Sequence, residues 1–269
     1  FACFPLRSCP TIWSLMDWAI FVPFFIFGTV PGSFLNVLIY RIPEEISIVS
    51  PRSFCPHCKT PIPFYRNIPI LTFLFQGGKC RICQKKISVQ YPLVEFISGV
   101  IWGWTFSNYN WQSAMFLSLL ISVLLVIAWI DFKEMIIPLN MLLTGVIIII
   151  LGVGFQILSW RISLYGSIVG PTAFGFILGI TYLVSKRMGM GSGDIQLSAI
   201  LGAWQGPVNI VLIFFIASFF SLLCWTILSL FHGFDKNRPL PFAPFLVVSA
   251  VMLFVTEYYV GSGIFELFN

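Results

Sequence analysis

The chain has 269 residues, of which 58% are hydrophobic and only 9% are charged, and its mean hydropathy is +0.94. A water-soluble core of this size does not need so much apolar surface, so the composition excludes a soluble globular protein and predicts a lipid bilayer around most of the chain. The net charge of +5 is modest, and the 29 phenylalanines and 9 tryptophans fit lipid-facing and interfacial positions better than a surface that binds nucleic acid. We therefore expect the bilayer as a partner and expect no nucleic-acid partner.

Eight apolar segments predict the fold class, an all-α polytopic membrane protein with about eight transmembrane helices. Several are shorter than the ~20 residues that a helix perpendicular to the membrane needs, so we expect tilted helices and shared boundaries. Asp17 precedes the first segment without a basic region or an A-x-A site, so no cleavable secretory signal is expected. In chain order the segments are 18–39, 93–107, 113–130, 138–158, 165–185, 194–204, 208–230 and 242–260.

One polar stretch is long enough to form a domain. It divides the chain into residues 1–39 with the first transmembrane helix, a polar domain at 40–91, and residues 92–269 with the remaining helices. If the polar domain faces the cytoplasm and the helices alternate in direction, 13 of the 15 lysines and arginines lie on the cytoplasmic side, and only Arg7 and Arg161 lie outside. This bias is what the positive-inside rule predicts.

The polar domain 40–91 contains two C-x-x-C pairs, Cys55 with Cys58 and Cys80 with Cys83. Each pair can supply two ligands of a tetrahedral S₄ site, and the spacing is typical of a zinc ribbon. Thiolate ligands favour Zn²⁺, with iron as an alternative. Disulfides are the other interpretation, but a cytoplasmic location keeps thiols reduced. A closed S₄ site has no open position for substrate, so we expect a structural metal.

Acidic residues at the expected cytoplasmic ends of the apolar segments are candidates for catalysis. Asp131 ends the third segment, Asp194 begins the sixth, and Glu95 lies near the start of the second. Two carboxylates that share a site cannot both ionise at low cost, which provides an acid and a base in one place, as in aspartic proteases. Gly191 and Gly193 would let a substrate backbone approach Asp194 closely.

Other interpretations of these acids stay open at this point. Asp194 could simply cap a helix after a glycine-rich turn, and Asp131 could be an interfacial residue beside Lys133. A membrane transporter coupled to ions or protons, with a structural zinc domain, also needs buried acids and is the alternative function.

Five segments, in order along the chain, resemble the type IV prepilin peptidases, which are membrane aspartyl proteases with a G-x-G-D signature. "GMGSGDIQLSAILGAWQG" resembles the signature itself, and "IDFKEMIIP" resembles the segment of the first catalytic aspartate. The other three segments are "PGSFLNVLIYRIP" (31–43), "NIPILTFLFQGGKCRICQKKISVQYPLVEF" (67–96) and "LPFAPFL" (240–246). The chain departs from the common pattern at Gln196, Leu139 and Ala243, where many relatives carry Lys, Asp and Gly, but none of these positions is one of the two aspartates.

The resemblance implies that residues 92–269 form an aspartyl protease domain in which Asp131 and Asp194 are the catalytic pair, supported by Gly191 and Gly193. It implies a location in the bacterial inner membrane and cleavage of prepilin or pseudopilin leaders after a glycine. Many members of the family also methylate the new amino terminus with S-adenosylmethionine. For that cofactor the resemblance points to the polar domain, where Gly78 either permits its approach or simply makes the turn into the second cysteine pair.

Overall fold

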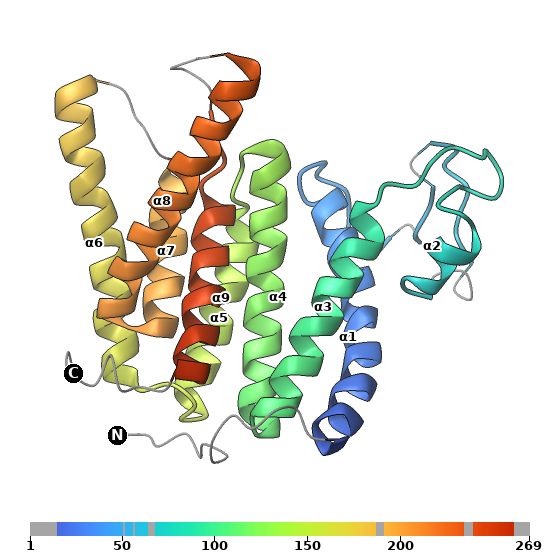
Figure 1. The fold of residues 1–269 in the computed structure, drawn as a ribbon, viewed down its shortest axis with the longest axis horizontal. Coiled ribbons are helices and arrows are strands. Elements are labelled where there is room, and N and C mark those ends of the chain that lie inside the picture. The colour runs from blue at the N-terminus through green and yellow to red at the C-terminus, as the bar shows by residue number, and fades with distance from the viewer. Residues whose placement is uncertain are drawn as a thin grey trace. The chain divides into compact units, whose positions relative to one another are not determined.

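The computed structural model describes residues 15–50, 52–55, 57–63, 68–186, 191–233 and 239–260. Within these residues the fold is helical (Figure 1), with nine α-helices, two isolated β-bridges and no β-strand. In chain order the helices are α1 (Leu15–Arg41), α2 (Leu71–Phe75), α3 (Gln90–Asn108), α4 (Trp111–Glu134), α5 (Leu139–Gly154), α6 (Trp160–Ser185), α7 (Ser192–Gln205), α8 (Pro207–His232) and α9 (Ala243–Val260).

The all-helical prediction is confirmed, and each predicted apolar segment corresponds to one of the helices other than the short α2, although the segment 138–158 extends four residues beyond the end of α5. Within the described part of the chain, five helices are long and apolar enough to cross a membrane. The chain is therefore a multi-pass membrane protein with five candidate spans on these criteria, rather than the eight that were predicted. The helix α7 has 14 residues and a length of about 21 Å, which is less than the ~30 Å of a bilayer's hydrocarbon core. The five spans are Asp17–Arg41, Trp111–Glu134, Trp160–Ile180, Pro207–Phe231 and Ala243–Val260.

The chain forms two compact units, and the boundary between them falls within α4, between Ser122 and Val123. The N-terminal unit contains α1, α2, α3 and the first half of α4. The C-terminal unit contains the second half of α4 and the helices from α5 to α9. Each unit is described by itself. The predicted division at 39/40 and 91/92 stays a prediction.

In the N-terminal unit, α1 and α3 pack closely because each contributes a G-x-x-x-G sequence to their contact. The glycines are Gly28 and Gly32 on α1 and Gly99 and Gly103 on α3. A Cβ atom built on any of the four would lie 2.5 to 2.9 Å from an atom of the other helix. Small residues at this spacing let membrane helices approach to backbone contact, which strengthens van der Waals packing where lipid gives no hydrophobic drive.

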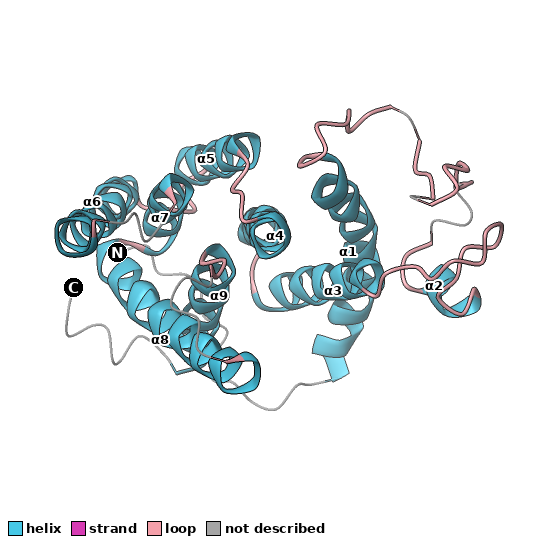
Figure 2. Cartoon of the chain, turned by 90° about the horizontal axis from the view of Figure 1, so that it is seen from above, coloured by secondary structure: helices cyan, strands magenta, loops and turns pink. Residues whose placement is uncertain are grey.

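The C-terminal unit uses the same device between α6 and α7. The backbones of Gly166 on α6 and Gly202 on α7 touch, and a Cβ on either glycine would overlap the other backbone. One turn away, a Cβ on Gly170 would lie 2.5 Å from the carbonyl oxygen of Ser198. Figure 2 shows α7 between α5 and α6, with α8 and α9 on its other side, and α7 contacts all four helices. The helix α7, which begins within the G-x-G-D sequence, is thus packed at the centre of its unit.

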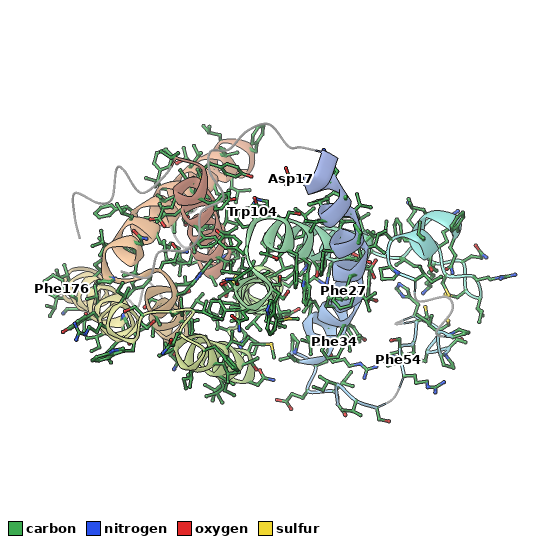
Figure 3. All side chains as sticks on the ribbon, turned by 90° about the horizontal axis from the view of Figure 1, so that it is seen from below. Asp17, Phe27, Phe34, Phe54, Trp104 and Phe176 are labelled. Atoms are coloured by element: carbon green, nitrogen blue, oxygen red, sulfur yellow. The ribbon has the colours of Figure 1, made fainter. Side chains whose placement is uncertain are left out.

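Large apolar side chains point away from the helices where lipid is expected (Figure 3). Phe27 and Phe34 on α1 and Phe176 on α6 are 55%, 50% and 70% exposed. Several serine and threonine side chains, in contrast, are buried, and the Thr105 and Ser118 hydroxyls share a buried hydrogen bond of 2.7 Å between α3 and α4. Apolar residues outside and hydrogen-bonded polar residues inside are the arrangement expected of helices in a bilayer.

Candidate active site and metal centre

The C-terminal unit brings together the two aspartates that were predicted to pair. Asp131 lies in the last turn of α4 and Asp194 in the first turn of α7, and they are only 6% and 7% exposed. The charge of Asp131 acts directly on the Asp194 carboxyl, so the two groups form an electrostatically coupled pair. Residues 63 positions apart in the sequence therefore share one buried site at helix ends.

The two carboxyl groups have different hydrogen-bond partners. Oδ2 of Asp131 accepts the backbone N–H of Ala243 at 3.0 Å, and Ala243 is the first residue of α9. The free N–H groups and the dipole at a helix N-terminus favour an anion. Oδ1 of Asp194 is buried and has no hydrogen-bond partner among the described residues. Each carboxyl therefore has one backbone hydrogen bond, Asp131 from Ala243 and Asp194 from Gly191, while Oδ1 of Asp194 is free for another ligand.

Gly191 and Gly193 have different structural roles, although the sequence suggested the same role for both. Gly191 precedes α7, its carbonyl accepts the N–H of Asp194 at 3.2 Å, and a Cβ on it would lie 3.8 Å from Oδ2 of Asp194. A Cβ on Gly193 would lie only 2.8 Å from Cβ of Ile137, in the loop after α4. Gly193 thus allows close packing of α7 against that loop, while Gly191 leaves open space beside the carboxyl. Gly189 and Met190, the first two residues of the G-x-G-D segment, lie outside the described part of the chain.

A coupled pair of buried carboxyls can perform acid–base chemistry on a peptide bond. When two carboxyls share a site, one keeps a proton at a pH where the other is ionised. The ionised group can deprotonate a water, and the protonated group can donate a hydrogen bond to the peptide carbonyl. The arrangement is compatible with such chemistry, because the two carboxyls share a buried site and Oδ1 of Asp194 is free to contact a ligand.

The Ala243 N–H was not predicted as part of the site, although Ala243 itself was noted in the "LPFAPFL" segment. A backbone donor leaves no residue type to recognise, so only the proline-rich start of an apolar segment marked this position as a helix N-terminus. Ile137 was likewise missed, since an apolar residue in a loop carries no chemical signal.

The N-terminal unit gathers the four predicted cysteines into a single cluster. All four Sγ atoms lie within 4.8 Å of one another, with 3.9 Å between Cys55 and Cys83 and 4.0 Å between Cys58 and Cys80. A tetrahedral zinc site with Zn–S bonds of about 2.3 Å places its sulfur atoms roughly 3.8 Å apart. The cluster therefore fits a tetrahedral Zn²⁺, and no further ligand is needed to complete the coordination.

The two cysteine pairs are held by two matching turns, displaced by 25 residues along the chain. In the first, the N–H of Cys55 donates to the Thr60 carbonyl, and the N–H of Lys59 donates back to Cys55. In the second, Cys80 is paired in the same way with Lys85 and Gln84. A β-bridge closes each turn, between residues 54 and 61 and between residues 79 and 86. The residue after each pair, at 59 and at 84, has a positive φ of 57° and 56°.

Hydrogen bonds prepare part of this cluster to bind a cation. Hydrogen bonds from the side chain and backbone of Thr60 lower the pKa of Cys58 to about 6, and backbone N–H groups of Cys83 and Ile82 lower the pKa of Cys80. A backbone bond from Lys85 also favours the Cys83 thiolate, but burial and the neighbouring thiols outweigh it and raise the pKa of Cys83 to about 11. Mutual repulsion thus limits how many thiolates form, and a bound divalent cation would remove that limit.

Gly78 occupies a turn, which favours the simpler of its two predicted roles. Its φ is +65°, a conformation that glycine adopts without strain. Its N–H donates to Phe73, and its carbonyl accepts the N–H of Ile87 at 2.7 Å. A Cβ at this position would lie 3.0 Å from the Phe73 ring. These contacts account for the glycine without a bound cofactor.

Two protein-family models match successive parts of the chain. A family model described as "Bacterial Peptidase A24 N-terminal domain" matches residues 26–109, and one described as "Type IV leader peptidase family" matches residues 118–227. No solved structure gives a significant match.

Similar proteins in several bacteria cover most of the chain. A protein of Neisseria gonorrhoeae named "Prepilin leader peptidase/N-methyltransferase" is 30% identical, over 86% of this chain and 89% of its own. Proteins with the same name are 31% identical in Bacillus subtilis, over 86% and 92%, and 37% identical in Myxococcus xanthus, over 70% and 58%. The similarity extends across both units and both sites described above. The chain therefore belongs to the type IV leader peptidase family.

Proposed function

We propose that this protein is a membrane aspartyl endopeptidase that removes the leader of type IV prepilins or related pseudopilins after a glycine, and that it then N-methylates the new terminal residue. The observation that carries the proposal is the buried, coupled pair of Asp131 and Asp194 in a chain of this family. The relatives named as leader peptidase and N-methyltransferase support both activities.

In the proposed mechanism a water molecule attacks the scissile carbonyl without a covalent acyl-enzyme. Asp131, whose charge is stabilised by the Ala243 N–H, takes the proton of the water. Asp194 donates a hydrogen bond to the carbonyl oxygen and stabilises the developing charge there. Gly191 leaves room beside Asp194 for the extended glycine of the leader junction.

We further propose that the protein lies in the bacterial inner membrane with residues 40–91 and the aspartates at the cytoplasmic face. The positive-inside distribution of lysine and arginine supports this orientation. Arg7, Arg66, Arg187, Lys236 and Arg238, which contribute to the count, lie outside the described residues. An even number of crossings, with α3, α5 and α7 completing eight, would put 13 of the 15 lysines and arginines on the cytoplasmic side. Water then reaches the aspartates without crossing hydrocarbon.

The residues of the cysteine cluster fit a structural Zn²⁺, which Cys55, Cys58, Cys80 and Cys83 would hold. The metal would tie together a polar segment that has little apolar core of its own. S-adenosylmethionine would supply the methyl group. The transporter alternative loses support, because the relatives that cover most of the chain carry peptidase and methyltransferase names.

The proposed function is tested in detergent with a precursor peptide in which the leader ends in Gly and the mature sequence begins with Phe. We expect the wild type to cleave after the glycine and Asp131→Asn or Asp194→Asn to abolish cleavage while remaining folded. The matched control is Glu257→Gln, which changes another acid of the same unit, at the far end of α9, whose Oε1 accepts a hydrogen bond from Asn209. Full cleavage by either aspartate variant would overturn the assignment, and no cleavage by the wild type would reopen the transporter reading.

A further inference from the structure

The N-terminal unit contains a buried acid that proteolysis does not use. Glu95 on α3 is only 8% exposed. Its Oε2 accepts the backbone N–H of Ile70 at 2.7 Å, and the hydroxyl of Ser33 on α1 is a second hydrogen-bond donor. Glu95 thereby connects both long helices of the unit to the segment just before α2. Burying an acid costs free energy, which its hydrogen bonds offset only in part.

A buried amide oxygen without a partner lies at the same level of the α1–α3 contact. Asn36 on α1 is 2% exposed, and its Nδ2 donates to the carbonyls of Gly32 and Tyr91 at 3.4 and 3.0 Å. Its Oδ1 has no hydrogen-bond partner within the described residues. Gly32 packs directly on Glu95, because a Cβ on it would lie 2.8 Å from Cα of Glu95, and Tyr91 precedes Glu95 by one helical turn. A buried acceptor without a partner destabilises the fold, so a bound donor would be favourable at this position.

The backbone next to Glu95 is strained. Ile70, whose N–H points at the carboxylate, has a φ of 59°. A positive φ is a genuine outlier for a β-branched residue, and strain of this kind concentrates at functional sites. The surrounding fold therefore holds this donor on Glu95 at an energetic cost.

We propose that Glu95 and Oδ1 of Asn36 form the site that binds the α-amino group of the cleaved substrate and accepts its proton for methylation. The inference rests on the proposed function and deepens its second half. The cluster offers only acceptors for a new ligand, which selects a group with several N–H donors and a positive charge. A divalent cation of the oxygen-binding kind would need about six oxygen ligands, more than this cluster presents.

The chemical step balances with the sulfonium methyl donor of the proposed function. The ammonium of the new terminal residue transfers one proton to the Glu95 carboxylate, which frees the nitrogen lone pair. That pair forms the N–C bond to the methyl group as the C–S pair returns to sulfur, which leaves a neutral thioether. The methylated nitrogen keeps two hydrogens and a positive charge, and the proton on Glu95 passes to water. No oxidant or reductant is required.

The test compares methylation and cleavage in the full-length protein, with its metal bound. Glu95→Gln keeps the shape of the side chain and removes the base, and we expect methylation of a peptide that begins with Phe to fall about 100-fold. Cleavage of the precursor peptide stays within about twofold, because that chemistry belongs to the coupled aspartates. The control is Ser98→Ala, which deletes a buried 2.7 Å hydrogen bond from α3 to the Gly28 carbonyl on α1 without touching the acceptors. It should methylate normally.

A binding measurement distinguishes a variant that no longer recognises the amine from a variant that is misfolded. The wild type should bind the Phe peptide about tenfold more tightly than its N-acetylated twin, and Glu95→Gln and Asn36→Leu should both lose this preference. Binding of S-adenosylmethionine and the zinc content should not change in either variant. Normal methylation by Glu95→Gln, or a preference for the free amine retained in both variants, would overturn the inference. A wild type that cleaves but never methylates would overturn it together with that half of the proposed function, while leaving the peptidase assignment intact.

Discussion

At the scale of single residues, the two aspartates differ in what solvates them. Asp131 accepts a backbone N–H from the first residue of α9, whereas Oδ1 of Asp194 is buried without a partner among the described residues. A hydrogen bond to a charged group contributes about 1.5–3 kcal/mol, more than a bond between neutral groups. The backbone N–H at the start of α9 therefore favours negative charge on Asp131, and residue 243 acts through its backbone.

This role predicts that Ala243→Pro impairs cleavage and Ala243→Gly does not. Proline is tolerated at the first position of a helix, so α9 should persist while the donor to Asp131 is lost. We expect the cleavage rate to fall about 10- to 100-fold, which corresponds to the loss of one bond to a charged group. Glycine keeps the N–H and should retain near-normal activity. Equal activity of both variants in a peptide-cleavage assay would show that the amide is dispensable.

Gly191, just before α7, and Gly193, in its first turn, differ in how much space surrounds them. A Cβ at 191 meets ordinary van der Waals distances, and the φ of Gly191 is −76°, which any residue adopts. A Cβ at 193 would lie 2.8 Å from Cβ of Ile137.

We therefore predict that Gly193→Ala destabilises the site while Gly191→Ala is tolerated by the fold. Overpacking of this kind costs about 1–3 kcal/mol, and at 193 it would push Asp194 away from Asp131. Thermal unfolding in detergent should show a lower midpoint for Gly193→Ala, with cleavage reduced in parallel. A normal midpoint and normal cleavage for that variant would contradict the packing role.

The chemical residues of the site could be predicted from the sequence, but the supporting contacts could not. The spacing of the four cysteines indicated a metal site, and the family resemblance pointed to Asp131 and Asp194, for which position alone left capping and interfacial roles open. The Ala243 N–H and the Ile137 contact depend on where two segments meet in space, and neither residue type signals such a role. The two aspartates' catalytic roles and the metal itself stay predictions.

At the scale of helices, small residues set the closest contacts. The G-x-x-x-G sequences of α1 and α3 face each other, and so do Gly166 and Gly202 of α6 and α7. Since α7 carries Asp194 in its first turn, the α6–α7 contact also fixes the depth of that aspartate. Apolar segments predicted all of these helices, and their spaced glycines were a signal for the pairing that the predictions had not used.

The contact predicts that Gly202→Ala is far more damaging than Gly175→Ala. A Cβ at 202 would overlap the backbone of Gly166, whereas a Cβ at 175, on α6, has nothing within 4 Å. We expect Gly202→Ala to lower the unfolding midpoint in detergent and to reduce cleavage, because α7 must shift. Gly175→Ala should equal the wild type or exceed it slightly, since alanine favours the helix. Similar midpoints for the two variants would argue against close α6–α7 packing.

At the scale of the whole molecule, the candidate chemistry is divided between two compact units. The coupled aspartates belong to the C-terminal unit, and the cysteine cluster with Glu95 belongs to the N-terminal unit. The sequence predicted eight crossings, while length and composition qualify five helices, because α3 carries polar residues and α5 and α7 are short. Hydropathy is calculated for one segment at a time. It therefore does not establish whether a short helix that packs inside a bundle crosses the membrane.

This division predicts that removing the metal separates the two activities. The polar segment has few buried apolar side chains, so its two turns depend on the ion to hold them together, whereas the aspartates are fixed by α4, α7 and α9. Chelation under reducing conditions, or Cys55→Ser, should therefore abolish methylation and leave leader cleavage largely intact. The measurement follows both products of one precursor peptide by mass spectrometry, and re-addition of Zn²⁺ to the chelated wild type should restore methylation. Parallel loss of cleavage would mean that the metal supports the C-terminal unit as well, and unchanged methylation without metal would show that the cysteine turns hold together on their own.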